Sequence, residues 1–141
     1  MNGAIYVAAL LLAGCGTSDA MLTMKLTSDG GITGRGVGGV TVDGTKVQAN
    51  DTRRTCEGTL SAAEEKQLRE LAAGAHPETW AESYASAERP HGAPDQIRYT
   101  LTVGNRPASW YGEGAEGVPQ EILRLRAALE AVRQRVMREC R

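Results

Sequence analysis

The sequence contains no phenylalanine, and aromatic residues make up only 4% of its 141 residues. Proteins that hold single-stranded nucleic acid stack its bases on aromatic side chains, so a nucleic-acid partner is not expected. A charge excess of either sign is lacking too, because the formal net charge is −1. So small a net charge gives no electrostatic attraction to nucleic acid or to an acidic membrane surface.

Histidine is scarce, and His76 and His91 are the only two in the chain. Neither stands at a zinc-ligand spacing from a cysteine or a pair of carboxylates, so we expect no metal ion. No serine or cysteine nucleophile motif accompanies them. We therefore interpret both as surface loop residues, and predict that the protein is not an enzyme and carries no small-molecule cofactor. The alternative is an enzyme with a loop site around one of the two histidines.

Long hydrophobic runs are lacking as well. The apolar run near the start covers residues 5–12, whereas a membrane-spanning helix needs roughly 20 apolar residues. It leads into Leu12-Ala13-Gly14-Cys15, which resembles the lipobox of bacterial lipoproteins. The resemblance implies cleavage just before Cys15 and attachment of lipid to its thiol. An ordinary buried N-terminal helix with an incidental cysteine is the alternative.

The lipobox implies that the chain divides into a signal peptide at 1–14, a tether at 15–20 and a single domain at 21–141. Removal of the signal leaves roughly 125 residues, enough for one hydrophobic core. The protein is then expected in the cell envelope as a membrane-anchored lipoprotein. Gly16, and not aspartate, follows Cys15, which resembles the outer-membrane sorting state of Gram-negative lipoproteins.

Cysteine occurs only three times. If Cys15 carries lipid, Cys56 and Cys140 remain as an even pair in an oxidising compartment. We predict that these two form a disulfide, which ties the segment before the first helix to the end of the last helix. Two free thiols, or a metal site that would need further ligands, are the alternatives.

Apolar–polar periodicity and turn residues predict the secondary structure. Strands are expected at 21–27, in the second half of 32–42, and at 45–49, 96–103 and 106–111, with helices at 61–73 and 119–139. Residues 50–58 are expected to be irregular, 77–84 to hold one more helical turn, and Gly74 to stop the first helix. The elements predict an α+β fold of order β-β-(β)-α-β-β-α. In it, two helices pack on one face of an antiparallel sheet of four to five strands.

Three features have both a binding and a structural interpretation. Trp110 and Tyr111 are either exposed binding anchors or core residues. The arginines of the last helix either contact acidic lipid headgroups or belong to a solvated face, which we favour; they are Arg124, Arg126, Arg133, Arg135 and Arg138. The glycine-rich segment 30–39 lacks the ending of a phosphate loop, so we interpret it as a flexible hairpin.

Two motifs support a family resemblance. One is the Ser-x-Gly-Gly turn at residues 28–31, and the other is the strand motif Pro-Asp-x-x-x-Tyr-x-Leu-x-Val at residues 94–103. With a capped helix between them and a helix at the C-terminus, they resemble emfourin, the protealysin-inhibitor family of small proteins that block thermolysin-like zinc metallopeptidases. The resemblance covers residues 22–132, and Ile32 stands where the family usually has an aromatic residue.

The resemblance implies a lipid-anchored inhibitor of a thermolysin-like metallopeptidase. A rigid hairpin can enter a protease cleft with little ordering cost, so we expect the contacts at the first turn and secondarily at a later hairpin turn. The residues are Ser28, Asp29, Gly30, Gly31, Ile32 and Thr33, then Gly104 and Asn105. The alternative function is a non-catalytic envelope binding or scaffold lipoprotein with another partner.

Overall fold

The computed structural model describes residues 20–85, 96–112 and 117–140, so the predicted lipidation site Cys15 and the loop residue His91 lie outside the described residues. The described strands are β1 (Thr23–Gly30), β2 (Gly39–Asp43), β3 (Lys46–Asn50), β4 (Thr55–Thr59), β5 (Ile97–Val103) and β6 (Arg106–Tyr111). They form one six-stranded antiparallel sheet of order β4-β3-β2-β1-β5-β6. The predicted α+β class is confirmed, with one strand more than expected.

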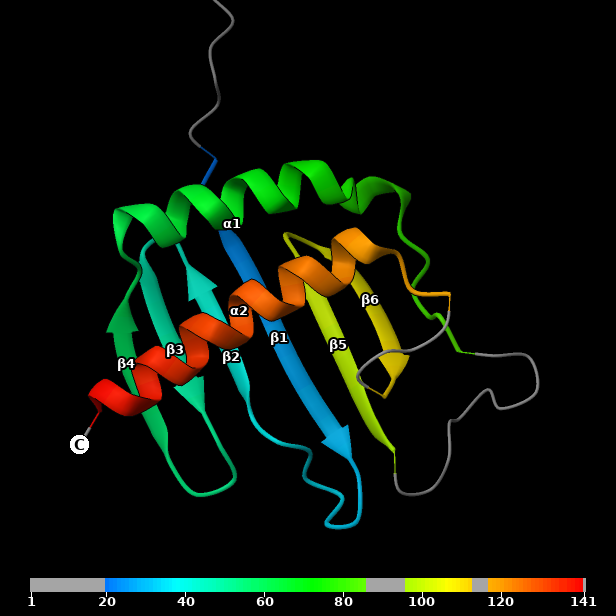
Figure 1. Ribbon diagram of the computed structural model, residues 1–141, viewed down its shortest axis with the longest axis horizontal. Helices are drawn as coiled ribbons and strands as arrows, with labels where there is room; N and C mark the ends of the chain where they lie inside the picture. Colours follow the sequence, from blue (N-terminus) through cyan, green and yellow to red (C-terminus); the bar gives the residue numbers. More distant parts are fainter. Residues whose placement is uncertain (1–19, 86–95, 113–116, 141) are drawn as a thin grey trace, which may run out of the picture.

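Two helices, α1 (Ala62–Ala75) and α2 (Gln120–Glu139), pack against this sheet. In Figure 1, α2 crosses the strands diagonally, and α1 runs beside it along the end of the sheet where β1 begins. Leu68 of α1 and Leu129 of α2 join the strand residues in one hydrophobic core. In the described part of the chain, the other face of the sheet carries no helix.

Helix α2 forms because its apolar residues recur at steps of three and four, which places them on one side. Those residues are all at most 3% exposed: Ile122, Leu125, Leu129, Val132 and Val136. Gly58 of β4 lies under the end of this stripe, where a Cβ atom would stand only 3.0 Å from a methyl carbon of Val136. The missing side chain at Gly58 therefore lets α2 approach the edge of the sheet.

Strand β4 corrects the expectation that residues 50–58 are irregular. Its alternation rests on Cys56, which is buried, and on Gly58, which has no side chain to bury. A strand whose inward residues are a cysteine and a glycine shows little hydrophobic periodicity, so sequence alone gives a weak signal for it.

Strand β1 also extends further than predicted. Ser28, Asp29 and Gly30 were expected in a turn, but they continue the ladder with β5. Only Gly31, Ile32 and Thr33 of the predicted contact residues at this turn lie beyond the strand. The long partner strand β5 supplies hydrogen-bonding groups that a local turn prediction does not consider.

Helix α1 begins at the predicted capping box. The Ser61 hydroxyl accepts the backbone N–H of Glu64, and the Glu64 carboxylate accepts that of Ser61. The predicted stop at Gly74 is wrong, because the helix continues to Ala75, which packs into the interior, and His76 takes the left-handed conformation with φ of 48°. The expected helical turn at 77–84 is only the short 3-10 turn Pro77–Thr79.

Trp110 is fully buried in β6 and stacks on Tyr99 of β5, with ring centroids 5.9 Å apart. Arg126 of α2 lies over the Tyr99 ring at 4.2 Å from its centroid. Of the two interpretations of Trp110, core packing is therefore the one that the structure shows.

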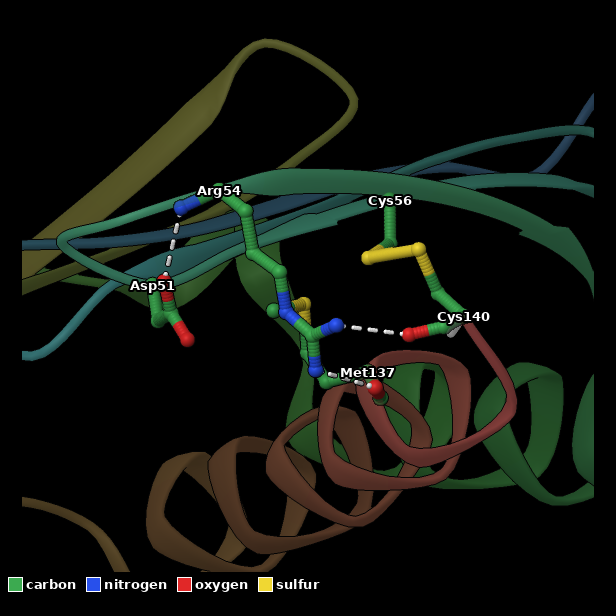
Figure 2. The surroundings of a disulfide bond; sticks show 5 residues. All are labelled: Asp51, Arg54, Cys56, Met137 and Cys140. Atoms are coloured by element: carbon green, nitrogen blue, oxygen red, sulfur yellow. Dashed lines mark hydrogen bonds between the residues drawn. A yellow bond between two sulfur atoms is a disulfide. The ribbon is translucent and has the colours of Figure 1, made fainter.

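A disulfide joins Cys56 of β4 to Cys140 at the end of α2, as predicted, with the Cα atoms 5.9 Å apart (Figure 2). Arg54 reinforces the same junction, since its guanidinium donates to the carbonyls of Met137 and Cys140 at 2.9 and 2.7 Å. A cation is favourable there because the last carbonyls of a helix carry partial negative charge. The edge strand and the end of α2 are thus held together by both a covalent bond and hydrogen bonds.

We predict that the disulfide stabilises the fold substantially. It closes a loop of 84 residues, which in the chain-entropy account is worth about 4 kcal/mol. Urea unfolding of the full-length chain in a non-ionic detergent should show this loss on adding a reductant. The double variant Cys56→Ala/Cys140→Ala is the control, and the reductant should not change its unfolding midpoint. An unchanged midpoint in the wild type would contradict the prediction.

Candidate functional site

The predicted contact residues lie at opposite ends of the sheet. Because β1 and β5 are antiparallel, Gly30 pairs with Ile97 at one end, and Gly104 donates its N–H to the Thr23 carbonyl at the other. We call the first the distal end and the second the N-terminal end, where Ala20 accepts a hydrogen bond from Arg69. One small cleft in a partner cannot hold both predicted segments, so the structure separates them into two candidate sites.

The connection from β1 to β2 at the distal end, residues 31–38, is called the distal loop, and the end of β1 from Ser28 to Gly30 forms its base. It carries its own hydrogen bonds: Gly34 N–H to Gly31 O at 3.1 Å and Gly36 N–H to Gly30 O at 3.0 Å. Ser28 closes its base, since its hydroxyl accepts the Val37 N–H at 2.9 Å and donates to the Gly38 carbonyl at 2.7 Å. The segment that was expected to be a flexible hairpin is therefore a loop that hydrogen bonds hold to its own base.

Two glycines of the distal loop are required by its close packing. Both have positive φ, 66° at Gly36 and 110° at Gly38. A Cβ atom on Gly36 would stand 2.5 Å from the Ser28 carbonyl oxygen, and one on Gly38 would overlap the Asn50 carbonyl oxygen. Side chains are therefore excluded on steric grounds at the base of the loop, as well as by backbone conformation.

The distal loop presents apolar side chains to solvent, Ile32 near its tip and Val37 near its base. Ile32 is 95% exposed and Val37 is 43% exposed, and they are two of the three exposed large hydrophobic residues in the described chain. On the same end of the sheet, Asp29 and Arg98 form a cross-strand ion pair at 3.0 Å, which raises the pKa of Arg98. An exposed isoleucine on a hydrogen-bonded loop is suited to insertion into an apolar pocket of a partner.

We predict that Ser28→Ala loosens the distal loop without unfolding the domain. The change removes two hydrogen bonds, each worth about 1 kcal/mol. Hydrogen exchange should therefore be faster at the Val37 amide by roughly tenfold or more. Thr33→Ala is the matched control in the same loop, because its hydroxyl accepts only one long bond of 3.4 Å from Arg35. Equal protection of Val37 in both variants would disprove the role of Ser28.

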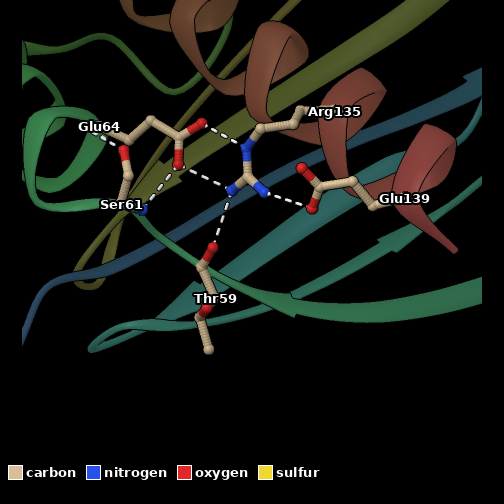
Figure 3. A network of polar contacts seen from close by, with 5 residues as sticks. All are labelled: Thr59, Ser61, Glu64, Arg135 and Glu139. Atoms are coloured by element: carbon tan, nitrogen blue, oxygen red, sulfur yellow. Dashed lines mark hydrogen bonds and ion pairs between the residues drawn. The ribbon is translucent and has the colours of Figure 1, made fainter.

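Another polar cluster lies away from the distal loop, between the two helices (Figure 3). Arg135 of α2 donates to both carboxylate oxygens of Glu64 at 2.6 and 2.7 Å, to the Thr59 carbonyl at 2.8 Å and to Glu139 at 2.8 Å. This pairing with Arg135 is the main cause that holds the pKa of Glu64 below its ordinary value. Each of these groups has a partner within the cluster, which orients α1 against α2.

The lowered pKa of Glu64 predicts a pH dependence of stability. A carboxyl whose pKa is lower folded than unfolded stabilises the fold above the unfolded pKa, and this stabilisation is lost as pH falls through the folded pKa. Glu64→Gln keeps the capping geometry but loses the charge. We expect urea midpoints of wild type and variant to differ at pH 7 and to converge as pH falls through the ordinary glutamate pKa and then through the lower folded pKa of Glu64. In the control Glu70→Gln, which breaks an exposed pair of 3.9 Å with Lys66, the difference should be small at every pH.

The described residues contain no cluster of metal-ligating side chains. No three His, Cys, Asp or Glu side chains stand close enough there to hold a metal ion. His76 is exposed and contacts Glu78 at 3.1 Å, beside the end of α1. Among the described helices, none is both long and apolar enough to cross a membrane. That the protein is not an enzyme stays a prediction.

The structure adds residues to the distal end that the sequence did not single out. A hollow is lined on one side by Ser28 and Arg35, and on the other by Asn50, Asp51 and Thr52. The β3–β4 turn therefore adjoins the distal loop. Its Asp51 carboxylate accepts the N–H groups of two following residues at 2.7 and 2.9 Å, an aspartate turn whose motif is visible in the sequence.

Comparison of the chain with models of protein families, with curated proteins and with solved structures finds no match.

Proposed function

We propose that this chain is a proteinaceous inhibitor of a thermolysin-like metallopeptidase, held in the cell envelope by lipid on Cys15. The distal loop is its contact element. The observation that carries the proposal is the tip of that loop, where Ile32 is almost fully exposed above a base fixed by Ser28. An inhibitor gains affinity when its binding loop is ordered before binding, because little conformational entropy is then lost.

The two motifs that resemble emfourin serve different purposes in this structure, one in the core and one in the distal loop. In the strand motif, Tyr99 and Leu101 are buried, so those positions serve the core. In the Ser-x-Gly-Gly motif, Ser28 fixes the loop base and Gly31 begins the turn that presents Ile32. One shared motif thus supports the fold, and the other supports an exposed apolar tip.

The position of Ala20, at which the described chain begins, also favours the distal loop over the turn at Gly104 and Asn105. Ala20 lies at the N-terminal end, next to Gly104 in a shallow hollow. The distal loop lies beyond the far end of β1, whose eight residues at roughly 3.3 Å each span about 26 Å. A lipid-anchored chain would therefore hold the loop away from its attachment point, where a protease can reach it.

The function is tested by mixing the full-length chain, purified in a non-ionic detergent, with several thermolysin-like peptidases. We expect inhibition of peptide hydrolysis by at least one of them at micromolar concentration or below. Unchanged activity across the set would overturn the proposal. Recovery of envelope proteins without a peptidase in a membrane pull-down would then favour the binding or scaffold alternative.

We predict that Ile32→Ala weakens inhibition by roughly thirtyfold, since loss of a buried aliphatic anchor costs about 2 kcal/mol at an interface. Ile32 is 95% exposed in the free protein, so the melting temperature should not change. Met21→Ala is the matched control, because Met21 is 68% exposed at the N-terminal end. Asn105→Ala should also leave inhibition unchanged. Equal inhibition constants for Ile32→Ala and Met21→Ala would place the contact elsewhere.

A further inference from the structure

We infer that a patch of arginines beside the distal loop binds an acidic surface of the target peptidase next to its cleft. The inference rests on the proposed function and extends it to the chemistry of the partner. The patch, called the arginine patch, consists of Arg35, Arg53, Arg54, Arg133 and Arg138. Its members come from the distal loop, the β3–β4 turn and the end of α2.

Four of the five arginines line two adjoining hollows, and the fifth, Arg53, lies in the β3–β4 turn between Asp51 and Arg54, which line them. One is lined by Arg54, Arg133 and Arg138, together with Asp51. The other is lined by Arg35 and shares Asp51 with the first. Segments separated by up to about a hundred residues in the chain thus form one continuous surface that begins at the distal loop.

Two of the five arginines serve the fold itself. Arg54 is bound to the carbonyls at the end of α2, as Figure 2 shows. Arg133 is paired with Glu130 at 2.6 Å and donates to the Asn50 carbonyl at 3.2 Å. These contacts hold their guanidinium groups in fixed places at the hollow between the turn and α2.

The other three arginines, Arg35, Arg53 and Arg138, are exposed. Within the part of the chain that the structure describes, none of them forms an ion pair with a carboxylate. The one carboxylate that lines both hollows, Asp51, is used by the turn: backbone N–H groups of Arg53 and Arg54 bind it and lower its pKa. The patch therefore carries guanidinium groups free for a partner.

This positive surface is local, because the whole chain has a net charge of only −1. Helix α1, at the N-terminal end, carries three glutamates against one lysine and one arginine. Guanidinium groups match carboxylates with paired hydrogen bonds, and surface charge mainly accelerates association with a partner of opposite sign. An acidic surface on the peptidase is thus the chemistry that the patch fits.

An acidic protein surface fits better than anionic lipid. The patch adjoins the distal loop, and it lies at the end of the strands away from Ala20, at which the described chain begins. A protein partner that receives Ile32 would also meet the patch. A lipid surface at the anchor would meet the N-terminal end first.

The test measures the association rate constant with an inhibited peptidase at salt concentrations from about 20 to 500 mM. The variant Arg53→Glu/Arg138→Glu should associate roughly tenfold more slowly than wild type at low salt, and the difference should vanish at high salt. The matched control is Arg106→Glu/Arg124→Glu, which makes the same charge change at exposed arginines outside the patch. Its rate should stay within about twofold of wild type. Melting curves of both variants must match wild type.

The experiment distinguishes failure of the arginine-patch inference from failure of the inhibitor proposal. If the peptidase is inhibited but both double variants associate equally, the patch inference is overturned and the inhibitor proposal stands. If no peptidase is inhibited, amide chemical shifts are recorded on titration with polyglutamate and with short-chain phosphatidylglycerol. Shifts at Arg35, Arg53 and Arg138 with polyglutamate, lost in Arg53→Glu/Arg138→Glu, would support an acid-binding surface without the peptidase. If the amide shifts of these residues change only with the lipid, or do not change at all, the arginine-patch inference is overturned.

Discussion

The packing of α2 across one face of the sheet is the contact on which the rest of the structure depends. Its apolar stripe, from Ile122 to Val136, covers the inner side chains of the strands. At its end, α2 can approach the edge strand β4 because Gly58 has no side chain. The Cys56–Cys140 disulfide and the hydrogen bonds of Arg54 then hold the helix at that edge. Without that covering helix, the apolar face of the sheet would be open to water.

In the described part of the chain, no helix runs along the distal end of the sheet, whereas α1 covers the N-terminal end. The distal loop can project because its backbone groups are satisfied by its own base, through Ser28, rather than by the core. Attachment of the end of α2 to the β3–β4 turn also brings Arg133 and Arg138 next to Arg54. The same contact that stabilises the fold therefore assembles the arginine patch beside the loop.

The elements with strong periodicity were predicted correctly. The alternation in β5 and the stripe in α2 each repeat over many residues, so local pattern and tertiary burial agree. Strand β4 was missed because its inward positions are Cys56 and Gly58, which carry little hydrophobic signal. Ser28 to Gly30 were taken for a turn because their residue types favour one, whereas pairing with β5 keeps them in the sheet. Similarly, α1 continues past Gly74 because the next residue, Ala75, is buried in the interior.

The sequence by itself determined the α+β class, the partners of the disulfide and the presence of a glycine-rich loop after the first strand. It also placed Ile32 on that loop. Only the tertiary structure decided that Gly104 and Asn105 stand at the other end of the sheet from Ile32, since strand direction sets which turns are neighbours. Likewise, the five arginines of the patch are scattered over residues 35–138. Their proximity arises from the crossing of α2 over the sheet, which no local pattern records.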